Sequence, residues 1–122
     1  MQLDVPPRWI MIAAKKTMKE TNRWSDCYDV LAAYYGVRKV TARVDPERVS
    51  DSAIACYVKH GPGEEPMIYT KESQVSSNVA FHEFGHHLQA TLLKGRLSKM
   101  ANEHFADSYA EAMEAVWNSI QA

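Results

Sequence analysis

The chain has 122 residues, 46% of them hydrophobic, and a formal net charge of −1 at pH 7. This size and composition predict a single folded domain over residues 1–122. The fourteen lysines and arginines are scattered, so we expect no nucleic-acid partner, and no apolar run approaches the roughly 20 residues of a membrane span. The N-terminus lacks the layout of a secretory signal, which favours a cytoplasmic location.

The first predicted element is a helix from about Pro7 to Glu20, because Pro7 suits a first helical turn. Its buried stripe is predicted from the residues that recur at helical spacing, which are Trp9, Ile12, Ala13 and Lys16. A second helix is predicted from a Ser25 cap through Tyr35, and Gly36 follows in the position where helices often stop.

Three short strands are predicted next, since β-branched and aromatic residues dominate three stretches bounded by turn residues. The stretches run from Val37 to Val44, from Ala53 to Lys59 and from Met67 to Thr70. The turn-forming sequence Gly61-Pro62-Gly63-Glu64-Glu65-Pro66 separates the last two.

The sequence His82-Glu83-Phe84-Gly85-His86 lies in a third predicted helix, from about Ser77 to Leu93, capped by a residue of the run 76–78. Two residues four apart on a helix differ by about 40° around the axis and roughly 6 Å along it, so both imidazoles can reach one metal ion. Glu83 lies about 100° from His82. It is therefore placed as a general base that contacts a metal-held water without binding the metal.

The predicted buried stripe of this helix lies beside the two histidines and consists of Phe81, Phe84, Leu88 and Leu92. Gly85 falls between the stripe and the histidines. Because a glycine weakens a helix, we expect another backbone to approach closely at this position. His87 points about 100° away from His86 and is expected to be a solvated surface side chain.

A catalytic zinc ion needs a third protein ligand, and a fourth predicted helix from a Ser98 cap to about Ile120 supplies candidates. Its buried stripe is predicted to contain Phe105, Tyr109, Met113, Val116 and Ile120. Glu103 is the first choice of ligand because it lies at the border of this stripe and the short connection makes the two helices neighbours. Asp107 ranks second and His104 third, and His104 is otherwise expected to be a solvated surface residue.

Asp107 shares a helix face with Glu103. It is thus placed to accept a hydrogen bond from the free ring N–H of a ligating histidine. The metzincin pattern would need a glycine and a histidine where this chain has Gln89 and Leu92. Because leucine cannot bind zinc, that class is excluded.

The sequence Asn102-Glu103-His104-Phe105-Ala106-Asp107 resembles the downstream signature of the gluzincins, Asn-Glu-x-x-Ser-Asp, with Ala106 in place of the serine. The resemblance implies that Glu103 is the third zinc ligand and that Asp107 orients a ligand histidine. The small size of the chain also resembles the compact ImmA/IrrE-like zincins and the minigluzincins. The similarity is confined to roughly residues 66 to 115.

The element order and the resemblance together imply an α+β fold, a small zincin-like domain. A short twisted three-stranded sheet would pack on the helix with the two histidines, with helices at the N-terminus and a C-terminal helix that carries the third ligand. The resemblance also implies that Met67 to Thr70 is the edge strand, to which an extended peptide could add.

The leading hypothesis is a zinc-dependent peptidase with Zn²⁺ on His82, His86 and Glu103, Glu83 as general base, and a peptide or protein as substrate. The alternative is a catalytically latent zinc-binding regulatory or interaction protein with a zincin fold. Such a protein would fill the fourth ligand position with a side chain.

Four side chains are candidates for stabilising an oxyanion, namely Tyr57, His60, Tyr69 and Tyr109. The two cysteines, Cys27 and Cys56, are expected to be reduced, buried thiols.

Overall fold

The computed structural model describes residues 4–59, 63–94 and 97–121, and this part of the chain contains four α-helices and three strands. The two N-terminal helices are α1 (Arg8–Thr21) and α2 (Trp24–Tyr35). The strands are β1 (Thr41–Val44), β2 (Ala55–Val58) and β3 (Met67–Thr70), with a short 3-10 helix, η1 (Pro46–Arg48), after β1. The chain continues with α3 (Ser77–Leu92) and α4 (Lys99–Ser119).

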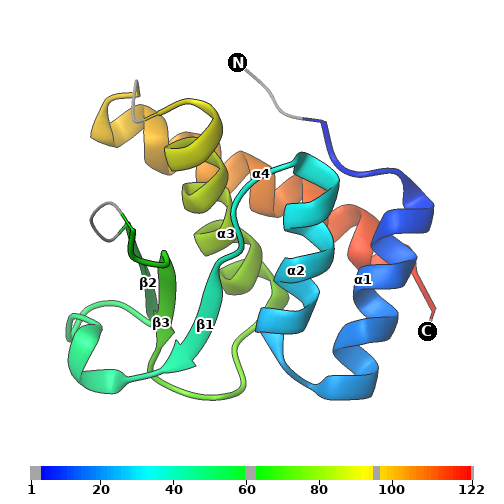
Figure 1. Ribbon diagram of the computed structural model, residues 1–122, viewed down its shortest axis with the longest axis horizontal. Helices are drawn as coiled ribbons and strands as arrows, with labels where there is room; N and C mark the ends of the chain where they lie inside the picture. Colours follow the sequence, from blue (N-terminus) through cyan, green and yellow to red (C-terminus); the bar gives the residue numbers. More distant parts are fainter. Residues whose placement is uncertain (1–3, 60–62, 95–96, 122) are drawn as a thin grey trace.

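The order of elements confirms the predicted α+β class, with two helices, three strands and two further helices. In Figure 1 the sheet lies at the lower left, α1 and α2 lie side by side at the right, and α4 runs across the molecule behind them. Helix α3 packs along β2 and against α4. The core between these layers is aromatic, and Tyr28, Phe81 and Phe84 are its largest fully buried side chains.

The sheet has the strand order β1-β3-β2, with β1 parallel to β3 and β2 antiparallel to it. The predicted edge position of Met67 to Thr70 is therefore wrong, because β3 is the central strand. Its composition agrees with this place, since Ile68, Tyr69 and Thr70 are all buried. The edge strand that packs along α3 is β2.

The buried face of α1 differs from the predicted stripe. Met11 and Ala14 are fully buried, whereas Trp9 is 70% exposed and Ile12 is 42% exposed. The reason lies in tertiary packing, because α1 packs against α2 and α4 with the face beside Lys15. The Lys15 Nζ donates to the carbonyl oxygens of Trp117 and Ile120 at the end of α4, at 2.6 and 2.8 Å, as suits a cation at a helix C-terminus.

Both cysteines are free thiols, as predicted. Cys27 is fully buried in the core, and burial raises its pKa to about 12. Cys56 is only half-buried, contrary to the predicted burial, because it lies on the edge strand β2. None of the helices in the described part of the chain is both long and apolar enough to cross a membrane.

Candidate metal centre

Two serine caps fix where α3 and α4 begin. The Ser76 hydroxyl accepts a hydrogen bond from the Val79 N–H, and the Ser98 hydroxyl accepts one from the Ala101 N–H, each at 3.2 Å. Such caps satisfy backbone donors that a first helical turn leaves unpaired. Both helices therefore begin within one residue of their predicted starts, which sets the direction of every side chain of the site.

The two helices lie close together at Gly85, as the presence of a helix-weakening glycine predicts. A Cβ atom added there would lie 3.1 Å from the Ala106 Cα and 3.3 Å from the Tyr109 ring. Ala106 is itself fully buried. The small residues at this crossing let α4 lie close enough for Glu103 and Asp107, on either side of Ala106 in the sequence, to reach the histidines of α3.

Three side chains converge between the helices. The Nε2 atoms of His82 and His86 lie 3.1 Å apart. One carboxylate oxygen of Glu103 is 3.3 Å from the His82 Nε2, and the other is 2.9 Å from the His86 Nε2. These residues form a group that could hold a metal ion, although the side chain of Glu103 is 55% exposed.

The outer nitrogen of each ring is held by an oxygen. The His82 Nδ1 is 2.9 Å from a carboxylate oxygen of Asp107, and the His86 Nδ1 is 2.9 Å from the Asn102 Oδ1. Because these oxygens only accept, both Nδ1 atoms carry the proton. The Nε2 of each ring then faces the other ring and Glu103.

Two ring nitrogens and a carboxylate at such short distances repel one another unless a proton or a metal cation lies between them. Zinc–ligand bonds of about 2.0–2.2 Å in a tetrahedron place neighbouring ligand atoms roughly 3.3–3.5 Å apart. The observed separations of 2.9, 3.1 and 3.3 Å are close to that spacing. The residues therefore fit a small divalent cation, and three protein ligands leave one tetrahedral position open.

Glu83 lies beside this group and is only 7% exposed. Burial raises the pKa of its carboxyl to about 7, His86 opposes the rise, and the charge of Glu103 adds to it. No side chain in the described part of the chain forms a hydrogen bond with this carboxyl group. A buried carboxyl with a pKa near neutrality can both accept and donate a proton in neutral solution.

A cleft of about 670 Å³ opens over the three converging residues. Its lining comes from β2 and its flanks, from α3 and from the first turn of α4. Among the residues predicted to stabilise an oxyanion, Tyr57 lines the cleft. Tyr69 and Tyr109 are buried, the hydroxyl of Tyr109 lies 3.1 Å from that of Tyr35, and His60 lies outside the described residues.

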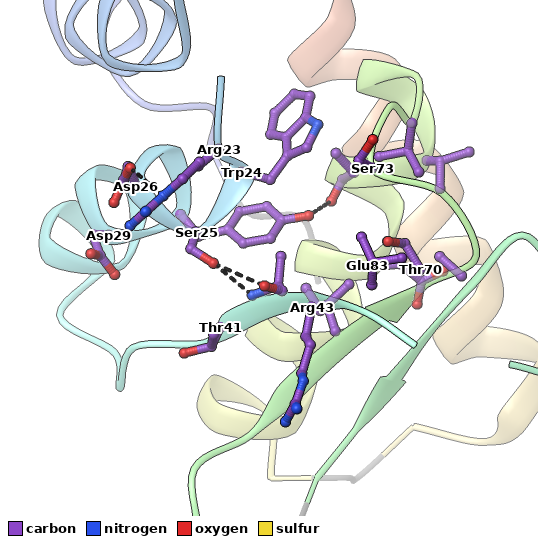
Figure 2. A pocket seen from close by; sticks show the side chains of 18 of the residues that line it. Arg23, Trp24, Ser25, Asp26, Asp29, Thr41, Arg43, Thr70, Ser73 and Glu83 are labelled. Atoms are coloured by element: carbon purple, nitrogen blue, oxygen red, sulfur yellow. Dashed lines mark hydrogen bonds and ion pairs between the residues drawn. The ribbon is translucent and has the colours of Figure 1, made fainter. Parts of the chain in front are cut away.

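A second cavity, of about 630 Å³, lies between α2, the sheet and the start of α3. Figure 2 looks into it, with Glu83 and Thr70 on one side and, on the other, Arg23, which precedes α2, and Asp26 and Asp29 of α2. Glu83 and Ala55 line both this cavity and the cleft. The two spaces therefore adjoin at the buried carboxyl group.

The prediction of a surface position for His87 is wrong. Its side chain is fully buried, the Nε2 lies 2.7 Å from the Arg38 carbonyl oxygen, and the Nδ1 lies 3.0 Å from the Tyr57 hydroxyl. The carbonyl must accept, so the Nε2 carries a proton, and in the neutral ring the Nδ1 then accepts from the Tyr57 hydroxyl. Burial lowers the pKa of His87, which agrees with that state. Its ring joins α3 to the edge strand β2.

His104 is exposed, as predicted, and lies outside the converging group. Asp107, the second choice of ligand, holds the far nitrogen of His82 instead. Asn102 is a residue of the site that the spacing argument does not identify. Its place directly before Glu103, at the start of a helix that returns across α3, was the available signal. Leu92 is 40% exposed and lies outside the core, contrary to the predicted stripe.

Comparison with known proteins yields no relative. No protein-family profile, curated protein or solved structure matches this chain.

Proposed function

We propose that this chain is a zinc-dependent peptidase of the gluzincin type. The observation that carries the proposal is the convergence of two imidazole Nε2 atoms and a carboxylate beside a buried carboxyl whose pKa is raised to about 7. The first feature suits a Lewis-acidic cation, and the second suits a group that takes up and releases a proton in each cycle.

A zinc ion in this place would polarise a peptide carbonyl and lower the pKa of a water molecule. Glu83 would accept a proton from the attacking water at a carboxylate oxygen and then deliver it to the nitrogen of the leaving amine. Its burial favours this role, because a carboxylate that is poorly solvated is a stronger base than one in water. Asp107 and Asn102 would keep the two imidazole rings in the tautomer that binds metal.

The edge strand β2 supports a peptide as the substrate. The Lys71 N–H donates to the Ile54 carbonyl oxygen at 3.1 Å, and antiparallel pairing then alternates along the strand. Consequently Cys56 and Val58 bond to β3, while the main-chain groups of Ala55 and Tyr57 point away from it. An extended peptide could pair with these groups and lie along the cleft.

The second cavity supports a preference for a large apolar side chain in that peptide. Its inner lining is mostly apolar and aromatic, and includes Trp24, Tyr28, Ile68, Val75, Val79 and Ala80. It adjoins the cleft at Glu83, so a side chain next to the cleaved bond could enter it. The charged residues of α2 lie across from Glu83, on the far side of the cavity.

The latent alternative would require a fourth side chain at the metal position. In the part of the chain that the structure describes, three such residues converge and Asp107 faces the outer nitrogen of His82. This arrangement favours an open coordination position and therefore the peptidase.

The proposal is tested by incubating the zinc-loaded protein with a library of internally quenched decapeptides. We expect cleavage with a preference for large apolar residues beside the cleaved bond. Glu83→Gln should retain one equivalent of zinc and lose at least about 100-fold in kcat. Glu111→Gln, an exposed control on α4, should cleave like the wild type. A wild type that holds zinc and cleaves no peptide would refute the activity.

A further inference from the structure

Gln89 is a nearly buried polar residue in the wall of the cleft. Its side chain is 3% exposed and lines the same space as His82 and His86. It follows His82 by seven residues, or about two helical turns, so it lies on the same side of α3. Gln89 is therefore part of the cleft and not of the aromatic core.

The amide nitrogen of Gln89 is left unpaired by the residues that the structure describes. It is buried, and in the described part of the chain no acceptor reaches it. The outer ring nitrogens of the two histidines are paired, since the His82 Nδ1 contacts Asp107 and the His86 Nδ1 contacts Asn102. An unpaired buried donor destabilises a folded protein, and such groups are rare without a functional reason.

An amide group offers a donor on one side and an acceptor on the other. A half-turn about its last torsion exchanges the two without moving the backbone, and this torsion is soft. The nitrogen of Gln89 can thus turn into the cleft when an acceptor arrives there. The missing partner is an oxygen that the described residues do not supply.

We propose that Gln89 donates a hydrogen bond to a main-chain carbonyl oxygen of the bound peptide, an inference that rests on the proposed peptidase function. In an extended peptide paired with β2, successive carbonyls point alternately toward β2 and away from it. Those that point away need donors from elsewhere in the cleft, and Gln89 supplies one from α3. Main-chain recognition of this kind does not depend on the sequence of the peptide.

The test replaces Gln89 by methionine, which keeps the length of the side chain and removes the donor. For the best-cleaved peptide of the library, Gln89→Met should raise KM by roughly 2- to 10-fold and leave kcat nearly unchanged, because a neutral hydrogen bond to the substrate is lost. Combined with Glu83→Gln, it should weaken binding of the same peptide by a similar factor in calorimetry. The exposed Gln121, replaced by methionine, serves as the matched control and should change neither quantity.

The thermal midpoint separates a substrate contact from a structural one. Gln89→Met should unfold at the same temperature as the wild type or a higher one, since it removes an unpaired buried donor. An unchanged KM and affinity in a wild type that cleaves peptides would overturn the role of Gln89 and leave the peptidase intact. A lower midpoint would show that the amide is bonded within the protein, which also overturns it. If the wild type cleaves nothing and Glu83→Gln binds nothing, the proposed function itself fails.

Discussion

His86 and His87 are neighbours on α3, yet the protein treats them in opposite ways. Both nitrogens of His87 are bonded within the fold, to Arg38 and Tyr57, and its side chain is fully buried. The outer nitrogen of His86 is bonded to Asn102, while its inner nitrogen faces His82 and Glu103 at the base of a cleft. Both nitrogens of His87 are thus satisfied within the fold, whereas the inner nitrogen of His86 is left to face the cleft.

This contrast separates stability from function on one helix. His87 ties α3 to β2 and makes the wall of the cleft rigid, so its removal should damage the fold. The side chains of His82, His86 and Glu103 bring electron-rich atoms close together. Removing one of them should therefore cost the fold little stability and should weaken metal binding strongly. Four substitutions examine this difference, three of them beside a matched control variant.

The largest effect is expected for His86→Ala. It removes one of the three proposed ligands, and structural zinc sites with four ligands are worth about 10–16 kcal/mol, or roughly 2.5–4 kcal/mol per ligand. The dissociation constant for zinc, measured by competition with a chromogenic chelator, should rise by about 100- to 1,000-fold. The control His104→Ala changes an exposed histidine and should bind zinc like the wild type. Equal affinities for all three proteins would exclude His86 as a ligand.

His87→Ala should act on stability instead. It empties a fully buried position and leaves the Tyr57 hydroxyl and the Arg38 carbonyl without a partner. The free energy of unfolding of the metal-free protein, from urea titration, should fall by about 2–4 kcal/mol. His104→Ala should change it by less than about 0.5 kcal/mol. A loss of similar size in both variants would mean that His87 is not held as described.

The carboxyl of Glu83 should make the metal-free protein depend on pH. Its pKa is raised from 4.5 to about 7 by burial, so between these values the folded protein holds a proton that the unfolded chain has released. The contribution of Glu83 to the free energy of unfolding is then most favourable below pH 4.5 and is lost as the pH rises from 4.5 through 7. At pH 8, Glu83→Gln should be more stable than the wild type by on the order of 2–3 kcal/mol, and at pH 4.5 the difference should vanish. A constant difference across that range would contradict the burial argument.

The smallest effect is expected for Asp107→Ala. The carboxylate lies 2.9 Å from the outer nitrogen of His82 and selects its tautomer. Loss of such a partner usually weakens metal binding by about 10- to 100-fold. Glu111→Ala removes an exposed carboxylate one turn further along α4 and should leave the affinity unchanged. If Asp107→Ala and Glu111→Ala have the same affinity for zinc as each other, Asp107 contributes only its charge and does not orient the His82 ring.

The local parts of this structure follow from the sequence more closely than the tertiary parts. Ser76, Ser98 and Gly36 mark helix ends because capping is decided within a few residues. Gly85 predicts the close approach of α4, since a glycine costs a helix stability that a tight crossing can justify. The convergence of His82 and Glu103 follows from one helical period and one short connection.

The errors all concern which neighbour a residue meets. The strand order depends on long-range pairing, so nothing local to Met67 to Thr70 distinguishes a central strand from an edge. The faces of α1 that bear Trp9 and Met11 are similarly apolar, and contact with α2 and α4 decides between them. His87 is buried because Tyr57 and Arg38 satisfy its ring, and both lie at least thirty residues away in the sequence.

The most direct test of the metal centre is a crystal structure of the zinc-loaded protein with anomalous data at the zinc edge. We expect one peak, about 2.0–2.2 Å from the Nε2 atoms of His82 and His86 and from one oxygen of Glu103. A water molecule should occupy the fourth position, within hydrogen-bond distance of Glu83. A peak without Glu103, whose side chain then points into solvent, would contradict the account, as would a fourth protein side chain in place of the water.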